Sequence, residues 1–212
     1  IAPQYDYAES FHNKYAKIFS EGFPNYINRF GIQTLQFKCI EIFPFNDGYA
    51  IVYTPYINGI RKAGVINEYG SLVIDTAFSE ISDYYEGLFN FQQPYNKHGV
   101  VDIRNNIVVP AGKFSNIGKF HNGFAKVSFN PPENNPSKLR YKGFINTSGE
   151  IVLTLDNTFY YELGEIVNTD SLFIAESFEY EPVKNAFSIG KRVAGGIMNM
   201  RGEWIMTDST NY

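Results

Sequence analysis

Histidine, cysteine and carboxylate side chains are the groups from which a metal site or a catalytic centre could be built, and here they are few and scattered. The three histidines are His12, His98 and His121. None stands at the His-x-x-x-His or His-Glu spacing that places zinc ligands on one element. His12 and His121 each precede an asparagine in two matching segments, so we interpret them as turn residues copied by duplication. The sequence therefore predicts no metal and no other cofactor.

Nucleophilic and acid–base chemistry also lacks a pattern. Cys39, the only cysteine, lies in an alternating segment from 36 to 40 that is typical of a strand, and we interpret it as a buried, inert thiol. The carboxylates of Glu176, Glu179 and Glu181 lie in a segment that we expect to be a polar loop, which favours a solvated surface over a glycosidase pair. No Gly-x-Ser-x-Gly elbow and no Gly-x-x-x-x-Gly-Lys phosphate loop occurs, so we expect a protein that is not an enzyme.

The composition indicates a β protein that does not bind nucleic acid and does not insert into a membrane. The 212 residues include 19 Phe and 16 Tyr, and aromatic and β-branched residues suit a pleated, half-buried surface. The formal net charge is −4, and no basic stripe runs along the chain, which argues against a nucleic-acid partner. No run of 18 apolar residues occurs, so we expect no membrane insertion and a soluble chain.

Two short motifs recur along the chain and indicate a tandem repeat. The first reads aromatic-x-x-Gly-aromatic-Ala-x-Val, as at 45–52 and 120–127. The second reads Gly-apolar-apolar-Asn-x-x-Gly-x-apolar-apolar, as at 64–73 and 143–152. We predict a single repeat domain over 1–212 with about five copies, numbered copy 1 to copy 5, at approximately 1–39, 40–77, 78–113, 114–158 and 159–212.

Each copy is expected to form three or four short antiparallel strands, because its segments alternate between apolar and polar residues. The Asn-x-x-Gly segment suits a tight hairpin with a type I turn opened by asparagine and a glycine where φ is positive. Asn105 takes the glycine position in copy 3, since asparagine tolerates the left-handed region better than most residues. A single hairpin is marginal in water, so aromatic rings should join neighbouring copies.

The predicted fold class is all-β, with tandem repeats of short antiparallel strands in an open curved array. A small closed β-propeller is the alternative, because about five units could complete a ring.

The two motifs together resemble the bacterial WG-type repeat, in which aromatic-x-x-Gly-x-Ala-x-Val precedes Trp-Gly-aromatic-Ile-Asp/Asn-x-x-Gly-x-Ile-Val. The resemblance extends from about Tyr5 to Met206. The tryptophan that names the repeat is replaced by Ala63, His98, Lys142 and Gly195. The resemblance implies a β-rich array with a binding or scaffold role and no catalytic residues. The chain starts Ile-Ala-Pro-Gln, so the compartment is left open between the bacterial cytoplasm and export after removal of a signal peptide.

The loops inside the copies, at 53–62, 92–98, 128–142 and 176–193, are where we expect binding. Repeat equivalence predicts that they emerge on one side of the array, and Tyr and Arg are frequent anchors of protein interfaces. The candidate binding residues are Tyr56, Arg61, Tyr95, Arg140, Tyr141, Tyr180 and Arg192. We expect a non-catalytic binding or scaffold module that engages another protein through these loops. The alternative is a carbohydrate-binding protein whose exposed tyrosines stack on sugar rings.

Overall fold

The structure is a computed structural model of the chain. It describes residues 4–12, 14–130, 142–155, 160–166, 172–183 and 186–207, and among these the side chains of 83, 160, 161, 165, 166, 179–183 and 186–192 are not described. All regular structure in the described residues is β, in 18 strands without any helix. The all-β fold class expected from the sequence is therefore confirmed.

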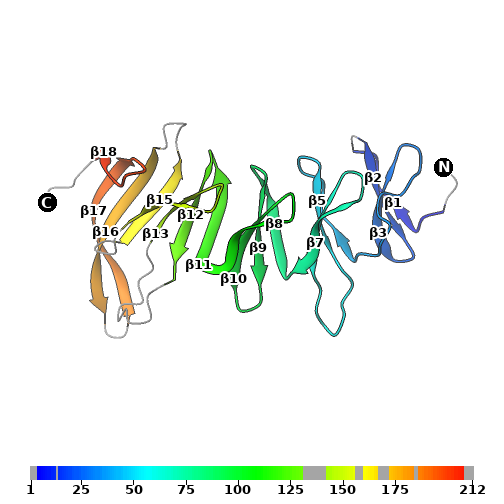
Figure 1. Cartoon of the computed structure of the whole chain (residues 1–212), viewed down its shortest axis with the longest axis horizontal. Coiled ribbons are helices and arrows are strands. Elements are labelled where there is room, and N and C mark those ends of the chain that lie inside the picture. The colour runs from blue at the N-terminus through cyan, green and yellow to red at the C-terminus, as the bar shows by residue number, and fades with distance from the viewer. Residues whose placement is uncertain are drawn as a thin grey trace. The chain divides into compact units, whose positions relative to one another are not determined.

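The strands form four sheets, and within each sheet every strand lies beside the strand that precedes it in sequence (Figure 1). The first sheet contains β1 (Tyr7–Ala8), β2 (Tyr15–Ser20) and β3 (Phe23–Asn28). The second contains β4 (Glu41–Ile42), β5 (Tyr49–Tyr53), β6 (Ala63–Asn67) and β7 (Leu72–Phe78).

The third sheet contains β8 (Glu80–Tyr85), β9 (Leu88–Gln93), β10 (Lys97–Asp102), β11 (Ile107–His121), β12 (Phe124–Phe129), β13 (Lys142–Asn146) and β14 (Ile151–Thr154). The fourth contains β15 (Tyr160–Ile166), β16 (Phe173–Val183), β17 (Ala186–Met198) and β18 (Trp204–Thr207). None of the sheets built from the described residues closes on itself, which is consistent with the expected tandem β-repeat in an open array.

The chain divides into two compact units. Unit 1 comprises Ile1–Tyr95 and Val101–Ile107, and unit 2 comprises Asn96–Val100 and Val108–Tyr212. The boundaries of the five copies stay a prediction.

The Asn-x-x-Gly segment forms the turn that the sequence predicts. In copy 2 the amide of Gly70 donates to the Asn67 carbonyl at 2.9 Å, and the Asn67 side-chain oxygen accepts from the amides of Tyr69 and Ser71 at 3.0 and 3.1 Å. Gly70 has a φ of +79°, a conformation that glycine adopts without steric cost. Asn105, at the equivalent place in copy 3, has a φ of +66°, so the expected replacement of glycine by asparagine is confirmed.

The first motif contains a second tight turn, at the place where His12 and His121 were interpreted as turn residues in copies 1 and 4. Asp47 and Gly48 have φ values of +47° and +84°, and two positive φ values are what a type I′ hairpin turn requires. Tyr49, the first residue of β5, pairs with Asn67. Both turns of copy 2 therefore lie at the same end of its sheet, which we call the turn end.

The Ala-x-Val part of the first motif supplies the core. Successive residues of a strand face opposite sides of a sheet, so alanine and valine two apart share one face. The alanine position is 1 to 2% exposed and the valine position 0 to 3% exposed in copies 1, 2 and 4, at Ala16, Ala50, Ala125, Ile18, Val52 and Val127. These positions recur because each copy buries the same face.

The expectation of a strand at 36–40 is wrong. These residues form no regular strand, and β4 begins only at Glu41. Cys39 is nevertheless fully buried, with its Sγ 3.6 Å from the Pro24 carbonyl oxygen. The alternation of side chains reflects alternate burial in the link between the first two sheets rather than strand pairing.

Aromatic rings join neighbouring copies within unit 1, as expected. The Tyr15 ring of copy 1 stacks on the Phe45 ring of copy 2, with centroids 5.6 Å apart. The Tyr49 ring of copy 2 meets the Tyr84 ring of copy 3 at 5.1 Å. The two pairs use equivalent motif positions. Tyr15 and Tyr49 follow the glycine position of the first motif, which is Lys14 in copy 1, and Phe45 and Tyr84 are the first aromatic residue of the motif in the next copy.

The Asn-x-x-Gly turn also touches the preceding copy. A Cβ atom at Gly70 would overlap the backbone of Thr34 in copy 1, so the turn backbone packs directly on that segment. In copy 3 the side chain of Asn105 replaces this close approach, and its Nδ2 donates to Asp75 of copy 2 at 2.8 Å. The turn glycine therefore has two roles. It adopts the positive φ that the turn needs, and its missing side chain allows close packing on the preceding copy.

Candidate functional site

The candidate loop at 53–62 is a hydrogen-bonded hairpin tip rather than an irregular loop. The loop after β5 continues the ladder: the Thr54 amide donates to the Lys62 carbonyl at 2.8 Å, and the Ile57 amide donates to the Ile60 carbonyl at 2.9 Å. Asn58 and Gly59, with φ values of +53° and +75°, close it. Because Asn-Gly is the preferred pair for a type I′ turn, the sequence specifies this tip locally.

Apolar side chains are concentrated on this tip and on the turn after β9. Tyr56, Ile57 and Ile60 are 61%, 71% and 60% exposed on the tip between β5 and β6. Tyr95, on the turn after β9, is 94% exposed and has a φ of +65°. In Figure 1 the segment after β5 and the end of β9 both lie at the lower side of the view, which is the end opposite the turn end and is called the tip end here.

Arg61 is already engaged within the chain. Its Nη1 lies 2.9 Å from Glu41 Oε2, and its guanidinium stands 4.0 Å from the centroid of the Tyr53 ring. A guanidinium over an aromatic face with a carboxylate beside it combines cation–π attraction with an ion pair. In the structure this side chain fixes the base of the β5–β6 tip against β4.

The remaining candidates lie outside the described residues or have side chains that are not described. Arg140 and Tyr141 lie outside the described residues. Tyr180 lies in β16 and Arg192 in β17, with side chains that are not described. The expectation of a loop over 176–193 is wrong, because β16 and β17 pair antiparallel from Phe173 with Met198 to Val183 with Ala186, with register shifts on either side of Phe178. The same pairing places the segment with Glu176, Glu179 and Glu181 in a strand.

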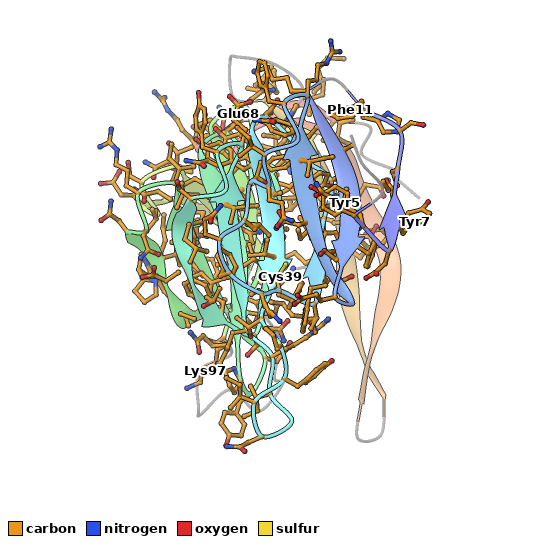
Figure 2. The ribbon with its side chains drawn as sticks, turned by 90° about the vertical axis from the view of Figure 1, so that its right-hand side faces the viewer. Tyr5, Tyr7, Phe11, Cys39, Glu68 and Lys97 are labelled. Carbon is orange, nitrogen blue, oxygen red and sulfur yellow. The ribbon has the colours of Figure 1, made fainter. Side chains whose placement is uncertain are left out.

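A groove at the turn end of unit 1 was not anticipated. It encloses about 750 Å³ between copies 1 and 2. The rings of Tyr15, Tyr26 and Phe45 form its apolar part, and its polar lining consists of Glu9, His12, Lys14, Lys17, Asp47 and Glu68. Figure 2 shows Glu68 and Phe11 at the same end of the sheets, with Cys39 deeper in the interior.

The charged residues of this groove differ in how they are engaged. Lys14 pairs with Glu68 at 3.2 Å, and the Lys17 Nζ donates to the Ile42 carbonyl at 3.2 Å. Glu9 and Asp47 have no side-chain partner among the described residues. Burial raises the pKa of the Tyr26 hydroxyl, and the negative charge of the Glu9 carboxylate adds to that rise.

The sequence offered only a weak signal for the groove. His12, Lys14 and Asp47 belong to two copies of the first motif, but the contact between the copies depends on the fold. The exposed Ile57 and Ile60 lie in the loop at 53–62 where binding was expected, but they were missed because the candidate residues were restricted to Tyr and Arg. Their signal was local: isoleucines flank an Asn-Gly pair on both sides.

The Cys39 thiol is fully buried. Burial raises the pKa of the Cys39 thiol from 9.0 to about 11, so the thiol is protonated at neutral pH. The described residues contain no group of three or more His, Cys, Asp or Glu side chains arranged to hold a metal ion. Nor do they contain a helix with the length and apolar character needed to cross a bilayer.

Repeated turn chemistry, repeated buried positions and open sheets define a tandem β-repeat protein. A family model described as WG containing repeat matches residues 1–22, 64–94 and 99–130. These three matched stretches support a WG-type β-repeat protein, as the resemblance of the motifs predicted.

Two solved structures are similar to the chain at a low level. A computationally designed protein, Ika8, is 11% identical with a TM-score of 0.40, and the match covers 93% of this chain and 59% of the designed one. A protein of unknown function from Bacteroides caccae is 12% identical with a TM-score of 0.33, and the match covers 94% of this chain and 79% of the other. This chain therefore spans less than two thirds of Ika8. No curated protein matches the sequence.

Proposed function

We propose that the chain is a non-catalytic binding module that engages another protein through its hairpin tips. The observation that carries the proposal is the exposure of Tyr56, Ile57 and Ile60 on one rigid tip. Scattered apolar residues are ordinary on a surface, but a contiguous group is typical of an interaction site. Tyrosine adds a large contact area with few rotatable bonds, so ordering it on binding costs little entropy.

The hairpin geometry supports a preorganised site. Ladder hydrogen bonds and the Asn58–Gly59 turn hold the tip in one conformation, and Arg61 braces its base through Glu41 and Tyr53. A binding element that is already ordered loses less conformational freedom when the partner docks. The tip thus offers the apolar centre of an interface.

A carbohydrate-binding role is the second candidate, and the same tyrosines would carry it. Sugar recognition by stacking favours a platform of coplanar rings. Tyr56 and Tyr95 sit on separate tips, and neither ring pairs with another described ring. The isoleucines beside Tyr56 offer no hydrogen bonds to hydroxyl groups. These observations favour a protein partner over a glycan.

The test compares three forms of the full chain after a binding partner has been captured, identified and purified. The tip variant carries Tyr56→Ser, Ile57→Ser and Ile60→Ser. The control carries Phe30→Ser and Tyr69→Ser, which remove rings that are 88% and 76% exposed at the turn end.

In the tip variant the dissociation constant measured by calorimetry should rise by roughly 30-fold or more. This corresponds to a loss of about 2 kcal/mol of binding free energy, as expected when a central anchor of an interface is removed. The control should bind like the unaltered chain, and circular dichroism should show both variants folded. Unchanged affinity in the tip variant would contradict the proposal. A glycan array bound through Tyr56 would favour the second candidate instead.

A further inference from the structure

We propose that the groove at the turn end of unit 1 is a docking site for an arginine side chain carried by an extended peptide segment of a partner protein. The site is separate from the hairpin tips and does not depend on their function. It combines an aromatic wall from two copies with carboxylates that have no described partner.

The aromatic wall is fixed by contacts between copies. Phe45 of copy 2 stacks on Tyr15 at an interplanar angle of 29° and meets Tyr26 with centroids 5.2 Å apart. Tyr26 is itself only 9% exposed, and its hydroxyl is directed toward the Phe43 carbonyl oxygen at 3.5 Å. All three rings line the groove, and the π faces of aromatic rings carry a negative electrostatic potential that attracts cations.

The charge of the groove favours a positive ligand. The two lysines are committed, Lys14 to Glu68 and Lys17 to a backbone carbonyl. This leaves the carboxylates of Glu9 and Asp47, both lining the groove. Lys17 keeps its positive charge, so the carboxylates of Glu9 and Asp47 leave the lining with one negative charge in excess, which favours an incoming cation.

The chain already contains a site of the same composition, occupied by its own arginine. Arg61 lies over the Tyr53 ring at 4.0 Å and pairs with Glu41 at 2.9 Å. The groove has the ring and the carboxylate but supplies no guanidinium of its own. A planar guanidinium can stack on a ring while its N–H groups reach a carboxylate, which an ammonium group does less well.

The size of the groove favours a peptide over a small free cation. Its volume of about 750 Å³ lies in the range of roughly 300–1,000 Å³ that is usual for sites that enclose ligands of many atoms. A lone ammonium or guanidinium ion would leave most of that space to water. An arginine side chain with its flanking backbone would occupy more of it.

The experiment uses the full 212-residue chain and fluorescein-labelled, end-blocked Ala-Ala-Arg-Ala-Ala, read by fluorescence anisotropy. The matched probes replace arginine by citrulline, which is neutral and nearly isosteric, or by lysine. Acetyl-arginine amide serves as an unlabelled small competitor. The protein variants are Glu9→Gln and Asp47→Asn, with Glu21→Gln as a control for the loss of one exposed carboxylate outside the groove. Asparagine suits the left-handed conformation of residue 47, so the Asp47→Asn turn should still form.

The arginine peptide should bind at least about tenfold more tightly than the citrulline peptide, because cation–π and charge-assisted contacts are both lost with the charge. Each groove variant should weaken binding by about fivefold, while Glu21→Gln should leave it unchanged.

Equal binding of the citrulline peptide would overturn the proposal, as would an equal loss in the Glu21→Gln control. A lysine peptide that binds as tightly would overturn the assignment to arginine. Competition by acetyl-arginine amide at the same concentration as the peptide would overturn docking of a segment and leave a small-cation site. None of these results bears on the hairpin tips, which are tested by serine substitutions elsewhere.

Discussion

Replacing Gly70 by alanine should destabilise the protein much more than the same change at Gly48, although both glycines have positive φ. The values are +79° and +84°, so the backbone cost of about 1–2 kcal/mol for an L-residue in this region applies to both. A Cβ at Gly48 meets nothing within 4 Å, whereas a Cβ at Gly70 would overlap the carbonyl group of Thr34. The difference between the variants therefore isolates the joint between copies 1 and 2.

The size of that difference follows from the kind of contact. The obstacle is backbone rather than the end of a flexible side chain, so one copy must shift against the other. Overpacking of this type costs typically about 1–3 kcal/mol. Gly70→Ala should thus lower the free energy of unfolding by about 2–5 kcal/mol, and Gly48→Ala by about 1–2 kcal/mol.

Urea unfolding followed by circular dichroism measures both variants against the unaltered chain. Hydrogen exchange of the Tyr26 amide in β3 and the Val52 amide in β5 adds a local reading, because a shifted joint should speed exchange in both copies. Equal losses for Gly70→Ala and Gly48→Ala would refute the reasoning, since the left-handed backbone alone would then explain the effect. Under that result the turn glycine would have no role between copies.

Three further substitutions have distinct expected outcomes. Asn105→Gly should change stability by less than about 1 kcal/mol in urea titrations, because the lost hydrogen bond to Asp75 is offset by the ease with which glycine adopts positive φ. Arg61→Met should cost about 1 kcal/mol and speed hydrogen exchange at the β5–β6 tip, since the exposed ion pair is weak but the ring contact also goes. Cys39 should resist thiol reagents until unfolding. The unfolded thiol ionises near pH 9.0, whereas the folded thiol, with its raised pKa, stays protonated up to about 11. The free energy of unfolding should therefore keep this contribution in full below pH 9.0 and lose it as the pH rises toward about 11. Cys39→Ala, which removes the titrating group, should lack that part of the decline in stability measured across this pH range.

Turn chemistry was the most predictable part of the fold, because each turn is specified by a few adjacent residues. Asn67 supplies a side-chain acceptor and Gly70 the positive φ, so the hairpin could be predicted without knowing its neighbours. The Asp47–Gly48 pair carries an equally local signal for a type I′ turn.

Contacts between copies could be predicted in kind but not in detail. The abundance of Phe and Tyr indicated aromatic joints, yet nothing in the sequence paired Tyr15 with Phe45. The groove beside this pair depends on residues that lie about 30 positions apart in the chain, and such proximity is set by stacking rather than by local propensity. The failed loop assignment at 176–193 has a related cause, because β16 and β17 are longer than their counterparts and polar residues on an exposed face do not prevent pairing.

The two ends of the sheets are under different constraints, and this difference bears on where binding can evolve. At the turn end, Gly70 packs on the backbone of copy 1 and Asn105 bonds to copy 2, so a change there disturbs the joint as well as the turn. At the tip end, a Cβ at Gly59 would meet nothing within 4 Å, and the tip can change length or composition while the ladder beneath it stays paired. Substitutions at the tips therefore alter what is bound at little cost to stability, whereas a site at the turn end, such as the groove, must be built from the residues that hold the copies together.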